Sequence, residues 1–154
     1  MSNIEFYDST VERELSESGV YASVTKGTSM RPLFKTHRDV VLLRKCTAEP
    51  RKYDVVLYKT KDGKYILHRI VKVLPDRFVI RGDNTFVREY VSKDKILAVL
   101  TEYNRKGRKY KVSDLGYVIY SRVWNYIYPL RFIWHKLLRM AYSVYKIIFK
   151  RNKL

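Results

Sequence analysis

The chain has 154 residues, which is enough for one domain with a moderate core and too few for two full-sized domains. Apolar residues make up 46% and charged residues 31%, with only six Gly and four Pro, a composition that excludes a disordered or collagen-like chain. Cys46 is the only cysteine, so no intramolecular disulfide can form, and neither a zinc site nor a secreted disulfide framework is indicated.

The net charge of +17 is distributed unevenly along the sequence. Residues 1–19 are acidic, whereas no acidic residue follows Asp114. The basic residues beyond Asp114 are Arg122, Arg131, Lys136, Arg139, Lys146, Lys150, Arg151 and Lys153. We therefore expect an anionic partner at the C-terminal end, most simply an anionic membrane surface. The sequence has no signal-peptide pattern and no apolar run of the ~18 residues that a membrane span needs, which predicts a cytoplasmic or peripheral membrane protein.

The predicted elements begin with a short acidic helix over residues 4–18, in which Ile4, Tyr7, Val11 and Leu15 have helical spacing. From residue 20 the pattern changes to short β-branched and aromatic runs. These runs predict strands over residues 21–25, 39–43, 53–59, 65–74, 78–81 and 96–103, and a hairpin turn at 106–108 leading into 109–112. The fold class is therefore mainly β: a small coiled β domain over 20–113, between an acidic helix in 1–19 and a basic helical tail over 114–154.

The tail is predicted to form helices over residues 115–128 and 130–150, with Asp114 as a possible cap and a break at Pro129. In the second helix the basic and polar residues fall in one arc, and the remaining circumference is apolar. Two interpretations stay open. The apolar arc packs on the β domain, or it lies in the interface of an anionic membrane, which suits Trp and Tyr beside basic residues.

Three short segments carry residues suited to catalysis. Ser29 lies in a turn directly after a predicted strand, although a turn serine is usually only structural. His68 interrupts an apolar strand, and an imidazole titrates near neutrality, as a general base requires. Asp83 follows another strand in a turn, where it could orient an imidazole or merely bond its own backbone.

Taken in order, these segments resemble the signal peptidase I superfamily, which also contains the LexA-type self-cleaving repressors. The matching blocks are Gly27, Ser29, Met30 and Pro32, then Asp54 to Tyr58, then His68-Arg69-Ile70, and finally Gly82-Asp83-Asn84. The resemblance implies the coiled β fold of that superfamily, with Ser29 as nucleophile and Met30 and Pro32 in the substrate-binding segment. Its His-Arg-Ile block is similar to the endoplasmic-reticulum and archaeal type, in which histidine is the base.

The sequence departs from the family pattern at several positions. Gly27 stands where some members have a serine that helps the oxyanion hole, so the Ser29 backbone N–H would have a larger share of that work. The endoplasmic-reticulum type has a second acid after the Gly-Asp-Asn turn, and the nearest candidate here is Glu89. Whether Asp83 or Glu89 supports His68 stays open. The family's N-terminal membrane anchor is not seen.

These observations predict a serine endopeptidase that cleaves a leader, signal or precursor peptide by a Ser-His mechanism, without metal or cofactor. Two alternatives remain. One is a LexA-like regulator that cleaves itself or binds a partner, and the other is an inactive membrane-binding module. About twenty residues precede the β domain, too few for a helix-turn-helix unit, so no nucleic-acid partner is expected.

Overall fold

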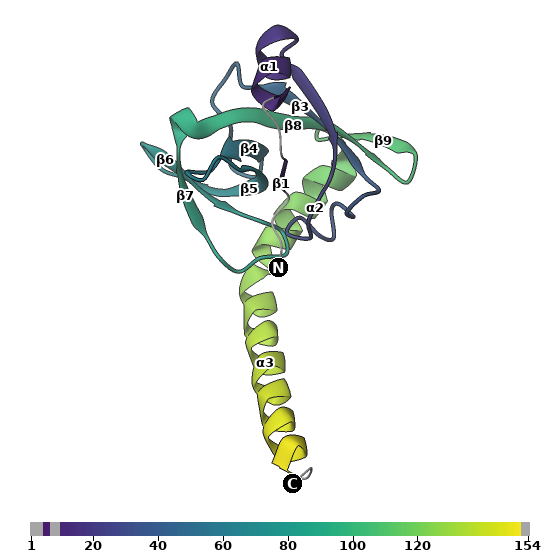
Figure 1. The fold of residues 1–154 in the computed structure, drawn as a ribbon, viewed down its shortest axis with the longest axis vertical. Helices are drawn as coiled ribbons and strands as arrows, with labels where there is room; N and C mark the ends of the chain where they lie inside the picture. The colour runs from purple at the N-terminus through teal and green to yellow at the C-terminus, as the bar shows by residue number, and fades with distance from the viewer. Residues whose placement is uncertain (1–4, 7–9, 152–154) are drawn as a thin grey trace.

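An antiparallel β-sheet forms the body of the part of the chain that the computed structural model describes, residues 5–6 and 10–151. Within those residues nine strands pair in the order β2-β3-β8-β4-β5-β6-β7, with β1 on β5 and β9 on β8. Figure 1 shows a curved body from which one long helix projects. The strands are β1 Glu5–Phe6, β2 Val20–Val24, β3 Val40–Lys45, β4 Val55–Lys59, β5 Tyr65–Val73, β6 Arg77–Arg81, β7 Glu89–Ser92, β8 Ile96–Arg105 and β9 Arg108–Lys111.

Three α-helices and one short 3₁₀ helix accompany the sheet in the described residues: α1 Thr10–Glu17, η1 Lys93–Lys95, α2 Leu115–Tyr126 and α3 Tyr128–Arg151. The prediction of a mainly β fold with a short N-terminal helix and C-terminal helices is therefore confirmed. The hairpin turn is confirmed as well, because Arg105 pairs with Arg108 and the two residues between them have positive φ. That is the backbone that a two-residue hairpin loop requires.

The sequence pattern does not predict β1 or β7. The helix expected over residues 4–18 begins only at Thr10, because Glu5–Phe6 pairs with β5 instead; Ile4 and Tyr7 lie outside the described residues. Strand β7 pairs with β6, yet Val91 is its one buried side chain. A strand with so little apolar signal is recognisable mainly by its partner.

Two hydrophobic cores lie on opposite faces of β4 and β5, because successive side chains of a strand point to opposite sides. The main core contains Leu67 of β5 and is covered by α1 and by the loop after β2. The second core consists of Val56, Tyr58, Ile66, Ile70, Phe78, Ile80 and Val91.

The main core crosses the boundaries expected between the three predicted segments. Val11 and Leu15 of α1 and Tyr117 of α2 are buried in the same cluster as strand residues of the sheet. Helix α1 and the first part of α2 are therefore not packing units separate from the sheet. The β domain, α1 and α2 share one core.

The break between the C-terminal helices lies at Ile127, not at Pro129 as the sequence suggests. Ile127 still donates its backbone N–H to Val123 O at 3.0 Å, and α3 begins at the next residue. Pro129 is thus in the first turn of α3, where proline fits because an N–H there has no partner within the helix.

Beyond its first turns, α3 leaves the sheet body and extends away from it (Figure 1). Its side chains from Lys136 to Lys146 are all exposed, and Trp134 retains 64% of its surface. Packing of the apolar arc on the β domain, one of the two interpretations of the tail, is therefore wrong for this part of the helix. Among the described residues, no helix is long and apolar enough to cross a membrane.

A buried ion pair joins the centre of β5 to the turn after β6. Arg69 is fully buried, and its Nε and Nη2 donate to the two carboxylate oxygens of Asp83 at 2.8 and 2.7 Å. Tyr120 of α2 donates to the same carboxylate at 2.9 Å, and Arg69 also bonds Tyr53 O and the Tyr117 hydroxyl. The pair therefore connects the sheet to α2.

We predict that Asp83→Asn lowers the free energy of unfolding by about 3–5 kcal/mol, because the substitution leaves the buried charge of Arg69 uncompensated. Urea unfolding followed by circular dichroism measures this change. Asp76→Asn is the matched control, since Asp76 pairs with Arg77 on the surface, and it should alter stability little. Wild-type stability in Asp83→Asn would contradict the role given to the pair.

Candidate active site

His68 lies in the middle of β5 and faces the second core. Its cross-strand partner on β4 is Val56, a member of that core, and the imidazole is 1% exposed. Arg69, the next residue, points to the opposite face and into its ion pair. The alternation of a strand thus separates the two polar side chains of the His-Arg-Ile block.

Glu89 of β7 holds the Nδ1 side of the His68 ring. Its Oε1 lies 3.0 Å from Nδ1, and Tyr58 donates a hydrogen bond to its Oε2 at 2.7 Å. Burial alone would raise the pKa of Glu89, but the hydrogen bonds from His68 and Tyr58 lower it below its usual value. A carboxylate can only accept, so the contact places the hydrogen on Nδ1 and, in the neutral ring, a lone pair on Nε2.

The structure brings Glu89, and not Asp83, against His68. Asp83 is on the far side of the strand, where Arg69 and Tyr120 occupy its carboxylate. Glu89 reaches His68 because β7 pairs with β6, so that Glu89 lies opposite Ile80 on the face of the second core. The geometry therefore distinguishes two acids that the sequence leaves equivalent.

Tyr58 is a site residue that the sequence analysis does not single out. Its hydroxyl lies 3.4 Å from His68 Nδ1 and bonds Glu89, and burial together with Glu89 raises the pKa of this phenol, which keeps it neutral. Its only mark in the sequence is its position at the end of the block from Asp54 to Tyr58. Nothing in the local pattern indicates that this tyrosine contacts the histidine.

Nε2 of His68 faces the loop that carries Ser29. Among the described residues it has no hydrogen-bond partner, although it is buried. A Cβ built on Gly82 would lie 3.0 Å from Nε2, 3.0 Å from Ser29 Cβ and 2.7 Å from Ser29 O. The imidazole and Ser29 therefore adjoin the same small space, which exists because residue 82 is glycine.

The Gly-Asp-Asn turn also holds the loop of Ser29. The backbone N–H of Asn84 donates to Ser29 O at 2.7 Å, and the Asn84 side chain donates to Thr28 O at 3.3 Å. At the other end of the loop, Gly27 has a φ of +84°, a conformation that favours glycine. Ser29 itself is fully buried.

Met30 and Pro32, the two residues expected in the substrate-binding segment, differ in their exposure to solvent. Met30 is fully buried in the main core with Leu33 and Phe34, so in this structure it anchors the loop and offers no surface to a substrate. Pro32 is exposed. Elsewhere in the described part of the chain, no group of three or more His, Cys, Asp or Glu side chains is arranged to hold a metal ion.

Comparison with known proteins yields no match to a protein-family model and no match to a curated protein. Function therefore has to be inferred from the geometry of the site.

We predict that Gly82→Ala displaces the Ser29 loop and costs about 1–3 kcal/mol of stability, because the added methyl group meets the backbone oxygen of Ser29 at 2.7 Å. Urea unfolding gives the cost, and amide NMR shifts of residues 28–30 report the displacement. Gly116→Ala is the control, since a Cβ there meets nothing within 4 Å and alanine favours the α2 helix. Equal stability and unshifted amides in Gly82→Ala would contradict the close approach.

Proposed function

We propose that this protein is a serine endopeptidase in which Ser29 is the nucleophile, His68 the general base and Glu89 the residue that orients the base. The observation that carries the proposal is the His68 ring, which Glu89 holds through Nδ1 while its unpartnered Nε2 adjoins Ser29. The arrangement has the roles of a Ser-His-acid triad. No hydrogen bond joins Ser29 to Nε2 here, and such contacts often tighten only when substrate binds.

In the proposed reaction, Nε2 accepts the proton of the Ser29 hydroxyl as Oγ attacks the scissile carbonyl carbon. The backbone N–H of Ser29 contributes to holding the oxyanion. The imidazolium then protonates the leaving amine, and a water molecule, deprotonated by the same ring, releases the acyl group from Ser29. Glu89 stabilises the imidazolium, and the hydrogen bond from Tyr58 fixes the carboxylate. Asp83 is a positioning residue in this scheme.

The proposed substrate is a leader, signal or precursor peptide that binds as an extended strand. Strand β5 already accepts such a segment, because Glu5–Phe6 pairs with it antiparallel at Tyr65–Ile66, close to His68 in the same strand. Ser29 and His68 are both enclosed, so a substrate must displace part of what covers them.

We predict that Ser29→Ala and His68→Ala each reduce peptide cleavage by about 10³-fold or more, and that the double variant is little worse, because the two residues act as one unit. Cleavage of a peptide library, read by mass spectrometry, measures the loss. A serine-directed acylating probe should label Ser29 and no other serine in the wild type.

Ser16→Ala and His37→Asn are matched controls on the surface and should retain activity. Additive losses in the double variant, or labelling of the wild type that persists in Ser29→Ala, would remove the dyad. Ser29-dependent shortening of the chain itself, without cleavage of added peptides, would favour the LexA-like self-cleaving alternative.

We propose further that α3 lies on an anionic membrane surface and brings the peptidase to substrates there. The basic side chains of Lys136, Arg139 and Lys146 are exposed on α3, as are Trp134 and Tyr145. Such a helix inserts its apolar arc at the headgroup level while its cations contact acidic lipid. The exposure of the apolar side chains from Leu137 to Tyr145 supports this proposal.

We predict that the full chain co-sediments with vesicles rich in acidic lipid and much less with neutral ones, since each basic residue near the surface contributes about 1 kcal/mol. Deletion of residues 137–154 should abolish most of this binding. The cut spares Trp124 and Arg131, which donate to Asp83 O and belong to the folded body. A folded truncation that sediments as well as the full chain would refute the membrane role of α3.

A further inference from the structure

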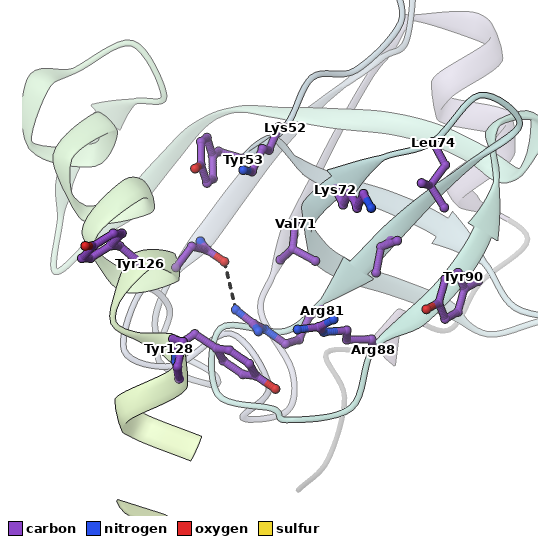
Figure 2. Close-up of a pocket in the computed structure, with 13 residues that line it drawn as sticks. Lys52, Tyr53, Val71, Lys72, Leu74, Arg81, Arg88, Tyr90, Tyr126 and Tyr128 are labelled. Atoms are coloured by element: carbon purple, nitrogen blue, oxygen red, sulfur yellow. Dashed lines mark hydrogen bonds between the residues drawn. The ribbon is translucent and has the colours of Figure 1, made fainter. Parts of the chain in front are cut away.

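A cavity of about 720 Å³ lies on the other side of the sheet from His68, where β5, β6 and β7 meet the junction of α2 and α3 (Figure 2). The strand register shows which face of the sheet the cavity lies on. Its lining residues Arg81, Val79 and Tyr90 are on the face that also carries Arg69. Ile80 and Glu89 are on the opposite face. The cavity is thus separate from the proposed active site. The residues of the peptidase mechanism do not line it.

The lining of the cavity is strongly cationic. Lys52, Lys72, Arg81 and Arg88 all contribute, and no Asp or Glu lines it. Within the described part of the chain none of the four forms a salt bridge, and the nearby carboxylate of Asp83 is already bound by Arg69. Like charges gathered in one hollow without a counterion repel one another, so an anion placed there is stabilised by all four.

Arg81 is the most enclosed of these cations, at 4% exposure. Its Nη2 donates to Asn125 Oδ1 at 3.0 Å, drawn as the dashed line in Figure 2, and its guanidinium lies 3.5 Å from the centre of the Tyr128 ring. Burial lowers the pKa of Arg81, because a charge withdrawn from water is less stable. A guanidinium has five N–H donors, and the bond to Asn125 uses one.

Tyrosines complete the cavity. Tyr53, Tyr90, Tyr126 and Tyr128 line it together with the four cations. Figure 2 shows Tyr128 beside Arg81 and the Tyr126 ring turned away from it. The Tyr128 hydroxyl donates to Phe86 O. The hydroxyls of the exposed Tyr90 and Tyr126 can donate hydrogen bonds to a ligand. The enclosed guanidinium of Arg81 combined with the exposed cations of Lys52, Lys72 and Arg88 suits an oxygen-rich anion of more than one charge.

We propose that this cavity binds a phosphate-bearing anion. The binding goes beyond the peptidase function and does not depend on it. Two sources share the chemistry: a free phosphate or diphosphate, and the headgroup of an acidic phospholipid. The charge of the cavity suits both sources equally. Tyr128 and Pro129 of the lining begin α3, so a phospholipid headgroup bound there would lie at the base of the proposed membrane helix.

The test uses the full chain and two double variants with the same loss of charge. Lys72→Gln/Arg88→Gln removes two exposed cations of the cavity, and Arg108→Gln/Lys109→Gln removes two exposed cations at β9. Calorimetric titration with inorganic diphosphate forms one arm. Sedimentation with vesicles that contain phosphatidylglycerol forms the other.

We predict that the cavity variant weakens the binding of at least one probe about tenfold, because two charge-assisted contacts are lost, whereas the β9 variant changes it much less. If diphosphate binds and the cavity variant weakens that binding, a soluble anion is sufficient to occupy the cavity. Cavity-dependent sedimentation without diphosphate binding identifies the lipid headgroup. If neither probe binds, or if the two variants weaken binding equally, the charge is only a general surface effect and the proposal fails. None of these results depends on peptidase activity.

Discussion

The buried ion pair between Arg69 and Asp83 is the contact on which most of the remaining structure depends. Removing two charges from water costs several kcal/mol per ion unless each finds its partner and its hydrogen bonds. Here the carboxylate is bound bidentately, and Tyr117 and Tyr120 of α2 complete the shell. The need to keep these charges together therefore holds the turn after β6, the centre of β5 and α2 in one arrangement.

The turn that carries Asp83 also contacts the proposed active site. Gly82 and Asn84 flank Asp83 in this turn, and both lie against Ser29. Gly82 has no side chain, which lets the backbone of Ser29 come close, and Asn84 donates its backbone N–H to the Ser29 carbonyl. Each residue of the Gly-Asp-Asn block thus contributes a different contact. Asp83 fixes the turn, Gly82 leaves room for the Ser29 loop, and Asn84 holds that loop through its hydrogen bond.

The alternation of side chains along β5 and β6 places the two proposed sites on opposite faces of the sheet. His68 faces the second core, where Glu89 and Tyr58 meet it, while Arg69 faces α2. Arg81 shares the face of Arg69 and lines the cationic cavity, directly before the turn that carries Gly82. The proposed peptidase site and the proposed anion site therefore share one turn but approach it from opposite sides of the sheet.

The local sequence pattern was sufficient to predict the strands and helices that have a clear hydrophobic periodicity or turn residues of their own. The β-branched runs, the Lys-Gly hairpin and the long helical pattern after Asp114 all appear as predicted, with small shifts at their ends. The motifs also indicated Ser29 and His68 as candidates for one site, and the structure brings them to the same small space. The strands, the hairpin and the helices follow from propensity and spacing within a few residues of chain, whereas the pairing of Ser29 with His68 is what the resemblance of the ordered blocks implies.

The remaining features depend on pairing between distant segments, which local sequence does not encode. Strands β1 and β7 are defined by their partners β5 and β6, and the register of β7 decides that Glu89, not Asp83, meets His68. Met30 is likewise buried by side chains distant in the sequence, among them Leu67 and Leu100 of the main core. Whether the apolar arc of α3 packs on the sheet was likewise a tertiary question, because amphipathic periodicity describes a helix face but not the surface that covers it.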